Sequence, residues 1–170
     1  MSRELNATAA SLLGLLAWRP MSGWELYAEF EHTIGHFWSI TRSQVYRELQ
    51  TLAERGYVEL GESGARERRV STITPAGREV FGAWIARMPG AEQIRFPFLL
   101  TVFFADAVPP AVLREATIEQ RRIHAARLEA YLAQIDEVRA HAPTPSLALD
   151  FGITYERAVL AWIDALPWMR

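Results

Sequence analysis

The chain has 170 residues, half of them apolar, a net charge of −2 and no cysteine. This apolar content can fill a globular core, and the lack of cysteine excludes disulfides, thiolate metal sites and a cysteine nucleophile. A generally basic nucleic-acid binder is also excluded, so any DNA-binding role rests on local charge. Between His36 and Arg78, seven arginines face five glutamates, a modest local excess.

A first helix is predicted from about Glu4 to Ala17, in a region that is mostly apolar. The apolar run has about the length of a signal-peptide core, but Arg3 is offset by Glu4 and no small-residue cleavage site follows. We therefore expect a buried first helix. No apolar run approaches the roughly 20 residues that cross a bilayer, and we expect a cytoplasmic protein.

A second helix is predicted from Gly23 to Glu31, and a third from about Thr41 to Arg55. In the third helix, Val45, Leu49 and Leu52 recur at the three- to four-residue spacing of a face turned to a core. The opposite face is polar and can touch a nucleic acid. Its candidate DNA contacts are Arg42, Ser43, Gln44, Tyr46 and Arg47.

These side chains suit different parts of a DNA duplex. Arg42 and Arg47 can reach guanine edges or phosphates, Gln44 can pair with adenine, and Tyr46 fits the backbone or a thymine methyl. Ser43 has two equal interpretations, a phosphate contact or a stabiliser of the helix start.

A hairpin is predicted to follow the third helix. Gly56 suits a left-handed helix end, Tyr57–Leu60 alternates as a strand does, and Gly61–Gly64 has turn chemistry. The second arm, Arg66–Ile73, leads into a helix that begins at Pro75 and reaches about Met88. Its candidate DNA contacts are Arg66, Arg68 and Arg69. Alternation puts the first two on one side of the strand and the third on the other, so at least one is expected to be merely solvated.

A helix, a hairpin and another helix in this order describe a winged helix-turn-helix. Six motifs of the first half together resemble the PadR family of bacterial transcriptional regulators. They are Leu12–Leu16, Met21–Leu26, His36–Ile40, Ser43–Tyr46 with Leu49 and Leu52, Gly56–Val58 and Ile73–Gly77. The chain departs from the family at Arg47, where a proline is usual, and at Ser71, where an aromatic residue is usual. The resemblance implies a DNA-binding homodimer, most often a repressor, with a small aromatic or phenolic effector in some members.

The second half is predicted to be helical. Arg95–Asp106 is densely apolar and predicts a buried helix, Pro110–His141 a long helix, and Ser146–Leu166 a last one. Its length and Phe151–Trp162 are similar to the dimerisation region of the longer PadR proteins. Two amphipathic helices joined by a short turn would leave one seam uncovered, so a partner subunit is the simplest cover. The candidate dimer-interface residues are Leu128, Tyr131, Ile135, Val138, Tyr155, Val159 and Trp162.

The aromatic loop His36, Phe37 and Trp38 has two interpretations, packing in a dry core or a pocket for an aromatic effector beside the helical part. His32 and His36 are spaced as metal ligands on a helix, but Gly35 interrupts them and no third ligand is near, so no metal site is expected. No nucleophile motif is present, and neither an enzyme nor a cofactor is expected.

We therefore expect a mainly α fold with a small β-hairpin, in which residues 1–90 form a winged helix-turn-helix domain and residues 91–170 a helical dimerisation domain with a possible effector-sensing role. The favoured function is a sequence-specific regulator of transcription, a repressor released by a small aromatic effector. The expected partners are an operator DNA duplex and a second copy of the chain, with no membrane. The alternative is a winged-helix adaptor that binds a protein and not DNA.

Overall fold

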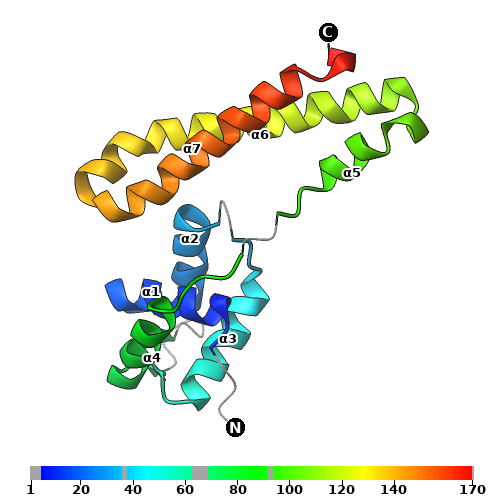
Figure 1. Ribbon diagram of the computed structural model, residues 1–170. Helices are drawn as coiled ribbons and strands as arrows, with labels where there is room; N and C mark the ends of the chain where they lie inside the picture. The colour runs from blue at the N-terminus through cyan, green and yellow to red at the C-terminus, as the bar shows by residue number, and fades with distance from the viewer. Residues whose placement is uncertain (1–4, 36–37, 63–68, 92–93, 170) are drawn as a thin grey trace. The chain divides into compact units, whose positions relative to one another are not determined.

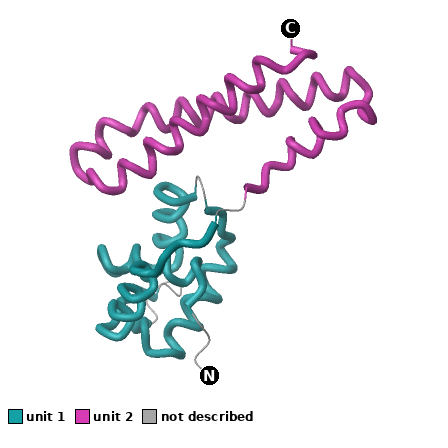
Figure 2. The backbone as a smooth tube through the Cα atoms, viewed as in Figure 1, with its two compact units in different colours: residues 1–91 teal, residues 92–170 magenta. Residues whose placement is uncertain are grey.

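The computed structural model describes residues 5–35, 38–62, 69–91 and 94–169. The chain divides into two compact units, Met1–Ala91 and Glu92–Arg170, which Figure 2 distinguishes by colour. Each unit has hydrophobic clusters of its own. Within the described ranges, no helix combines the length and the hydropathy that a bilayer crossing requires.

Helices in unit 1 begin where a polar side chain can cap them. Their bounds are α1 Ala7–Trp18, α2 Gly23–Thr33, α3 Arg42–Glu54 and α4 Pro75–Ile85 (Figure 1). The caps are Asn6, Ser22, Thr41 and Thr74, each of which accepts a hydrogen bond from the backbone N–H three residues on. Such a bond satisfies a donor that the first helical turn leaves unpaired. The predicted starts of α2, α3 and α4 are confirmed to within a residue, whereas α1 begins three residues later than predicted because Asn6 is its cap.

The small sheet of unit 1 has three antiparallel strands in the order β1-β3-β2. Their bounds are β1 Met21–Ser22, β2 Val58–Leu60 and β3 Val70–Ile73. The predicted hairpin is therefore present, with Val58 opposite Ile73, and Gly56 ends α3 at φ +72° as predicted. The prediction missed β1, because two residues are too short to show an alternating pattern.

The core of unit 1 surrounds α1. Leu12, Leu13, Leu15 and Leu16 are all buried although they point to different sides of the helix, which is the property of a helix enclosed by others. Residues from α2, α3 and all three strands, with Ile40, add to this cluster. The prediction of a buried first helix is confirmed.

Unit 2 is built on an antiparallel pair of helices, α6 Pro110–His141 and α7 Pro143–Asp164, joined at Ala142 (Figure 1). It also contains α5 Pro97–Phe103 and the short 3-10 turns η2 Ala105–Ala107 and η3 Pro167–Met169. Pro143 ends α6 as predicted, but it also opens α7 three residues earlier than predicted, since the first helical position needs no N–H.

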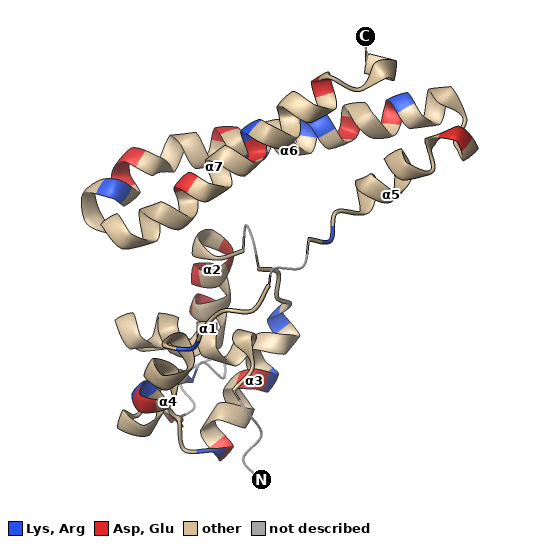
Figure 3. Ribbon diagram, in the orientation of Figure 1, with Lys and Arg blue, Asp and Glu red and all other residues tan. Residues whose placement is uncertain are grey.

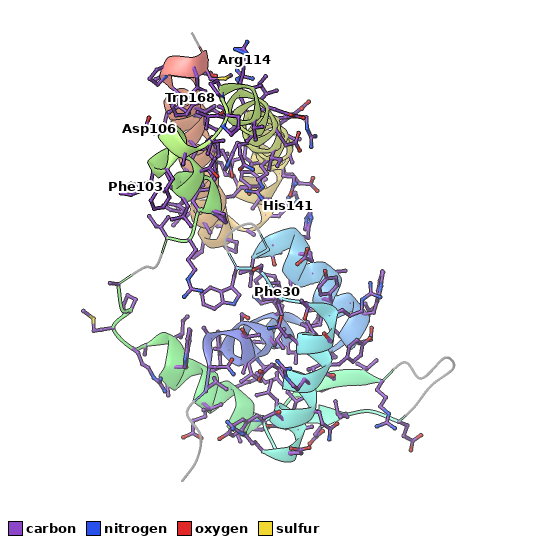
Figure 4. The ribbon with its side chains drawn as sticks, turned by 90° about the vertical axis from the view of Figure 1, so that its right-hand side faces the viewer. Phe30, Phe103, Asp106, Arg114, His141 and Trp168 are labelled. Atoms are coloured by element: carbon purple, nitrogen blue, oxygen red, sulfur yellow. The ribbon has the colours of Figure 1, made fainter. Side chains whose placement is uncertain are left out.

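Helix α5 corrects one prediction. Arg95–Asp106 was expected to form a buried helix, but in α5 only Phe98 is buried. Leu100 is 65% exposed and Phe103 79% exposed, and Figure 4 shows Phe103 on the outer side of its helix. A dense apolar run predicts burial, but it does not say whether the same chain supplies the cover.

Candidate nucleic-acid interface

Helix α3 has one buried and one exposed face. Val45, Leu49 and Leu52 are all at most 4% exposed, which confirms their predicted role in the core. The exposed residues of the other face are Arg42, Ser43, Tyr46, Arg47 and Gln50. Figure 3 shows the charged residues along this helix.

The first turn of α3 is held by a capping box. Gln44 Oε1 accepts a hydrogen bond from the Thr41 backbone N–H at 2.7 Å, and Thr41 Oγ1 accepts one from the Gln44 backbone N–H at 3.3 Å. Pairing with adenine uses the carbonyl and the amino group of a glutamine together, so base contact by Gln44 competes with this cap. The Ser43 hydroxyl lies 3.1 Å from that of Thr41 and is exposed, which keeps both of its interpretations open.

Helix α2 contacts α3 through aromatic side chains. The Arg42 guanidinium lies over the Tyr27 ring, 5.5 Å from its centroid. One turn earlier in α2, a Cβ added to Gly23 would come within 2.5 Å of the Tyr46 ring. The Tyr46 ring therefore packs directly on the α2 backbone, which keeps the two helices close together.

The hairpin is joined to the end of α3 at its base. Thr74 Oγ1 donates to the Gly56 carbonyl at 2.7 Å and accepts from the Gly77 backbone N–H at 3.0 Å. The Thr74 backbone N–H donates to the Tyr57 carbonyl at 3.0 Å. One threonine therefore connects the end of α3, the end of β3 and the start of α4.

The arms of the hairpin remain paired as far as Gly61, whose N–H donates to the Val70 carbonyl at 2.8 Å. Arg69, just before β3, is exposed. Arg66 and Arg68 lie outside the described residues. Ser71 is buried opposite both Met21 and Leu60, so the departure from the usual aromatic residue falls in the middle of the sheet.

Of the three predicted effector-site residues, only Trp38 lies within the described residues. Its indole N–H donates to Thr8 Oγ1 at 3.4 Å, and 42% of the residue is exposed. His36 and Phe37 lie outside the described residues. Within the described ranges, no group of three His, Asp or Glu side chains is placed to hold a metal ion.

Most of the residues predicted to form a dimer seam pack in two clusters inside one chain. Tyr131 and Ile135 of α6 pack with Ile153 of α7, and Leu128 lies beside them. Val159, Tyr155 and Trp162 pack in a second cluster with Phe98 of α5. Most of these side chains are therefore covered within one chain, by α5 as well as by the neighbouring long helix, and their place in a dimer interface stays a prediction. Val138 belongs to neither cluster.

Sequence reasoning also missed a buried polar pair. His124 Nδ1 of α6 contacts Glu156 Oε2 of α7, and both side chains are 3% exposed. Arg127 Nη1 lies 4.0 Å from the other carboxylate oxygen. Burial and the Glu156 charge raise the pKa of Tyr131, which the Arg127 charge partly opposes. Two polar residues 32 positions apart carry no local signal that they pair.

Helices α1 to α3, with an exposed basic face on α3 and a hairpin beside it, define unit 1 as a winged helix-turn-helix module, a class that places its third helix in a DNA groove. Comparison with known proteins agrees. Residues 12–83 match the model of the transcriptional regulator PadR-like family, and residues 94–166 match that of the virulence activator alpha C-terminal region. Residues 12–83 therefore belong to the PadR-like family of transcriptional regulators, and the second match covers most of unit 2.

Relatives resemble the chain over nearly its whole length. The negative transcriptional regulator PadR of Bacillus subtilis is 24% identical over 169 residues, covering 92% of this chain and 93% of the relative. Its crystal structure with operator DNA has a TM-score of 0.78 at 22% identity, covering 94% of this chain and 96% of that one. Its complex with p-coumaric acid has a TM-score of 0.74 at 23% identity, with the same coverage. A PadR-like regulator from Bacillus cereus has a TM-score of 0.82 at 20% identity, covering 92% and 93%. These structures share the fold of both units.

Proposed function

We propose that the protein binds operator DNA sequence-specifically as a homodimer, with α3 in the major groove and the β2–β3 hairpin on the adjacent backbone. The observation that carries the proposal is the division of α3 into a buried apolar face and an exposed face with two arginines. The hairpin stands beside this face and is fixed at its base by Thr74. The similar B. subtilis protein has been solved with operator DNA.

The proposed contacts divide into those that specify sequence and those that position the protein. Arg42 and Arg47 reach guanine edges or phosphates, and Tyr46 contacts the backbone or a thymine methyl. Ser43 and Gln44 lie at the start of the helix, where contacts with DNA compete with their contacts to Thr41. The arginines of the hairpin lie along phosphates or enter the minor groove, where the negative potential favours them; they are Arg66, Arg68 and Arg69.

We propose that the second copy covers the α5 face, defined as Leu99, Leu100, Phe103 and Phe104. These side chains are exposed in the single chain, and α5 contains no charged residue (Figure 3). An exposed apolar surface rimmed by charge is typical of an interface between subunits. A two-fold axis through unit 2 would let α5 of each copy cover the other, and residues 91–170 then act as the dimerisation domain.

We propose repression as the sign of regulation, because a relative that is similar over 92% of the chain is a negative regulator. We also propose a planar aromatic or phenolic effector, since that relative has been solved with p-coumaric acid. Such a ligand regulates only if it binds one dimer geometry better than another. A coupling of about 1 to 3 kcal/mol would change operator affinity by one or two orders of magnitude.

The experiment that tests DNA binding begins with selection and sequencing of the DNA fragments that the purified protein retains. The affinity of the best fragment is then measured at several salt concentrations for the wild type, Arg47→Ala and Arg157→Ala. Loss of a phosphate contact lowers the slope of log affinity against log salt by about 0.9. If Arg47 meets a base, affinity falls and sequence preference relaxes instead. Arg157 is exposed on α7 and serves as the control for removal of one positive charge.

An adaptor that binds a protein would select no fragment and would show no salt-dependent DNA binding. The effector is tested with the same fragment, by titrating phenolic acids that quench tryptophan fluorescence. Trp38→Phe should weaken both the binding of such a compound and its effect on operator affinity. Binding compounds that leave operator affinity unchanged would contradict the sensing role.

A further inference from the structure

The contact between Tyr27 and Arg42 joins the scaffold of unit 1 to its proposed DNA-facing surface. Arg42 is the first residue of α3 and is exposed, whereas Tyr27 is half-buried and packs against the core of unit 1. The guanidinium carbon lies 5.5 Å from the ring centroid, inside the roughly 6 Å within which a cation is attracted to an aromatic face.

The Tyr27 ring is held firmly enough to orient a partner. Its neighbours Leu26 and Phe30 are fully buried, and the capping box of Ser22 and Glu25 fixes the first turn of α2. Gly23 lies one turn before Tyr27 and therefore on the same side of the helix. The Tyr46 ring of α3 packs on Gly23 of α2. In return, the Tyr27 ring of α2 supports Arg42 of α3.

A ring beneath an arginine leaves its charge and its N–H donors available, whereas a carboxylate does not. Among the described residues, no carboxylate forms an ion pair with Arg42 and no side chain accepts a hydrogen bond from it. A carboxylate would neutralise the guanidinium and would have to be displaced by a phosphate or a base. A ring limits the rotamers of the side chain but occupies none of its five N–H donors.

We infer that Tyr27 is a positioning residue that orders the Arg42 side chain for DNA while leaving its charge and its donors free. The inference rests on the proposed DNA-binding function. A free arginine loses rotamer entropy when it is immobilised in an interface, and an arginine already ordered over a ring loses less. Removing the ring should therefore weaken DNA binding by about two- to five-fold, the strength of an exposed cation–π contact.

The test compares Tyr27→Phe and Tyr27→Leu, in the full chain and in the Arg42→Ala background, for affinity to the DNA fragment selected by the wild type. Phenylalanine keeps the aromatic face and should keep wild-type affinity. Leucine keeps an apolar side chain but has no π face, and it should lose two- to five-fold. In the Arg42→Ala background the two variants should bind equally, because the ring then has no arginine to orient.

A merely structural role of Tyr27 would give a different pattern. Loss of affinity in Tyr27→Leu that persists in the Arg42→Ala background would overturn the inference, as would equal losses in Tyr27→Phe and Tyr27→Leu. Wild-type affinity in Tyr27→Leu would overturn it too, while leaving the DNA-binding function intact. Failure of the unsubstituted protein to retain any fragment would instead remove the proposed function, and the inference with it.

Nuclear magnetic resonance of the free protein gives a readout that needs no DNA. The Arg42 Nε–H signal should carry a ring-current shift and reduced motion in the wild type and in Tyr27→Phe. Both should disappear in Tyr27→Leu. An Arg42 signal that is identical in the three proteins would show that the ring does not order the side chain.

Discussion

His124 and Glu156 join the two long helices of unit 2 through a contact that solvent does not reach. Their side chains are each 3% exposed, and the pair lies between the two apolar clusters of α6 and α7. The Phe96 ring stands edge-on to the imidazole at 5.3 Å between centroids. A polar pair in such surroundings restricts how the two helices can align, because a shift by one turn would bury each group without the other.

Removal of one member of this pair should destabilise unit 2 strongly. Glu156→Leu leaves the imidazole buried without its hydrogen-bond partner, and a loss of about 1–3 kcal/mol is expected. His124→Leu combined with Glu156→Leu should recover much of that loss, since neither polar group is then buried. Urea unfolding followed by circular dichroism measures the stability of the single and the double variant. Arg121→Leu, which breaks the exposed pair with Asp164, is the control and should change the midpoint far less.

The phenol of Tyr131 should make the protein sensitive to alkaline pH. Burial, followed by the Glu156 charge, raises its pKa above the usual 10.0, with Arg127 partly opposing. The unfolded chain therefore releases this proton first, and the contribution of Tyr131 is fully present below about pH 10 and is lost as pH rises through the folded pKa. Tyr131→Phe cannot ionise. The difference in unfolding free energy between the wild type and Tyr131→Phe should be constant from pH 7 to 9. Above pH 10 the wild type should lose stability relative to Tyr131→Phe. A difference that stays constant to pH 11 would contradict this assignment.

The two glycines of α4 should respond in opposite ways to the same substitution. A Cβ at Gly77 would lie 2.1 Å from the Tyr57 carbonyl oxygen, whereas a Cβ at Gly82 meets nothing within 4 Å. Gly77→Ala must therefore move the backbone at the base of the hairpin and should cost about 1–3 kcal/mol. Gly82→Ala should stabilise the helix by up to about 1 kcal/mol, as alanine is the better helix former. Thermal unfolding of the two variants side by side tests the close approach of α4 to Tyr57.

Substitutions on the α5 face should separate association from folding. Leu100→Asp and Phe103→Asp place a charge on side chains that are exposed in the single chain, so they should weaken dimerisation and leave the helical content unchanged. Ile135→Asp buries a charge inside the α6–α7 pair and should unfold unit 2. Light scattering at micromolar concentration, read together with circular dichroism, distinguishes the two effects. A wild-type protein that is monomeric under these conditions, or a Phe103→Asp variant that stays dimeric, would count against the α5 face as the interface.

Local signals in the sequence were sufficient for most of unit 1. Caps such as Ser22 and Thr74, the glycine at position 56 and the spacing of Val45, Leu49 and Leu52 are signals that act within a few residues, so they can be recognised along the chain. The same holds for the exposed arginines of α3. What the sequence hides is pairing between distant segments. It did not show that β1 adds to the sheet. The capping box of Thr41 and Gln44 was also missed, although its spacing is local.

Unit 2 illustrates the same limit more strongly. The stripes of α6 and α7 were recognised, but a periodic stripe is identical whether its cover is a neighbouring helix or another chain. The structure assigns Tyr131 and Ile135 to the neighbouring helix. It leaves the α5 face exposed, although that segment has the highest apolar density in this half of the chain. The pair of His124 and Glu156 could not be foreseen, since nothing near either residue distinguishes it from a surface group.

The bonds of Thr74 determine how unit 1 can respond to a signal. Its hydroxyl connects the carbonyl of Gly56 with the N–H of Gly77, and its own N–H reaches Tyr57. The first turn of α4 therefore cannot rotate by itself without breaking bonds at the end of α3. A displacement of α4 would therefore move α3 and the β2–β3 hairpin together. If the proposed dimer is regulated by such a displacement, the spacing between its two α3 helices would change while each helix keeps its shape, and the preferred half-site spacing of the operator would change with it.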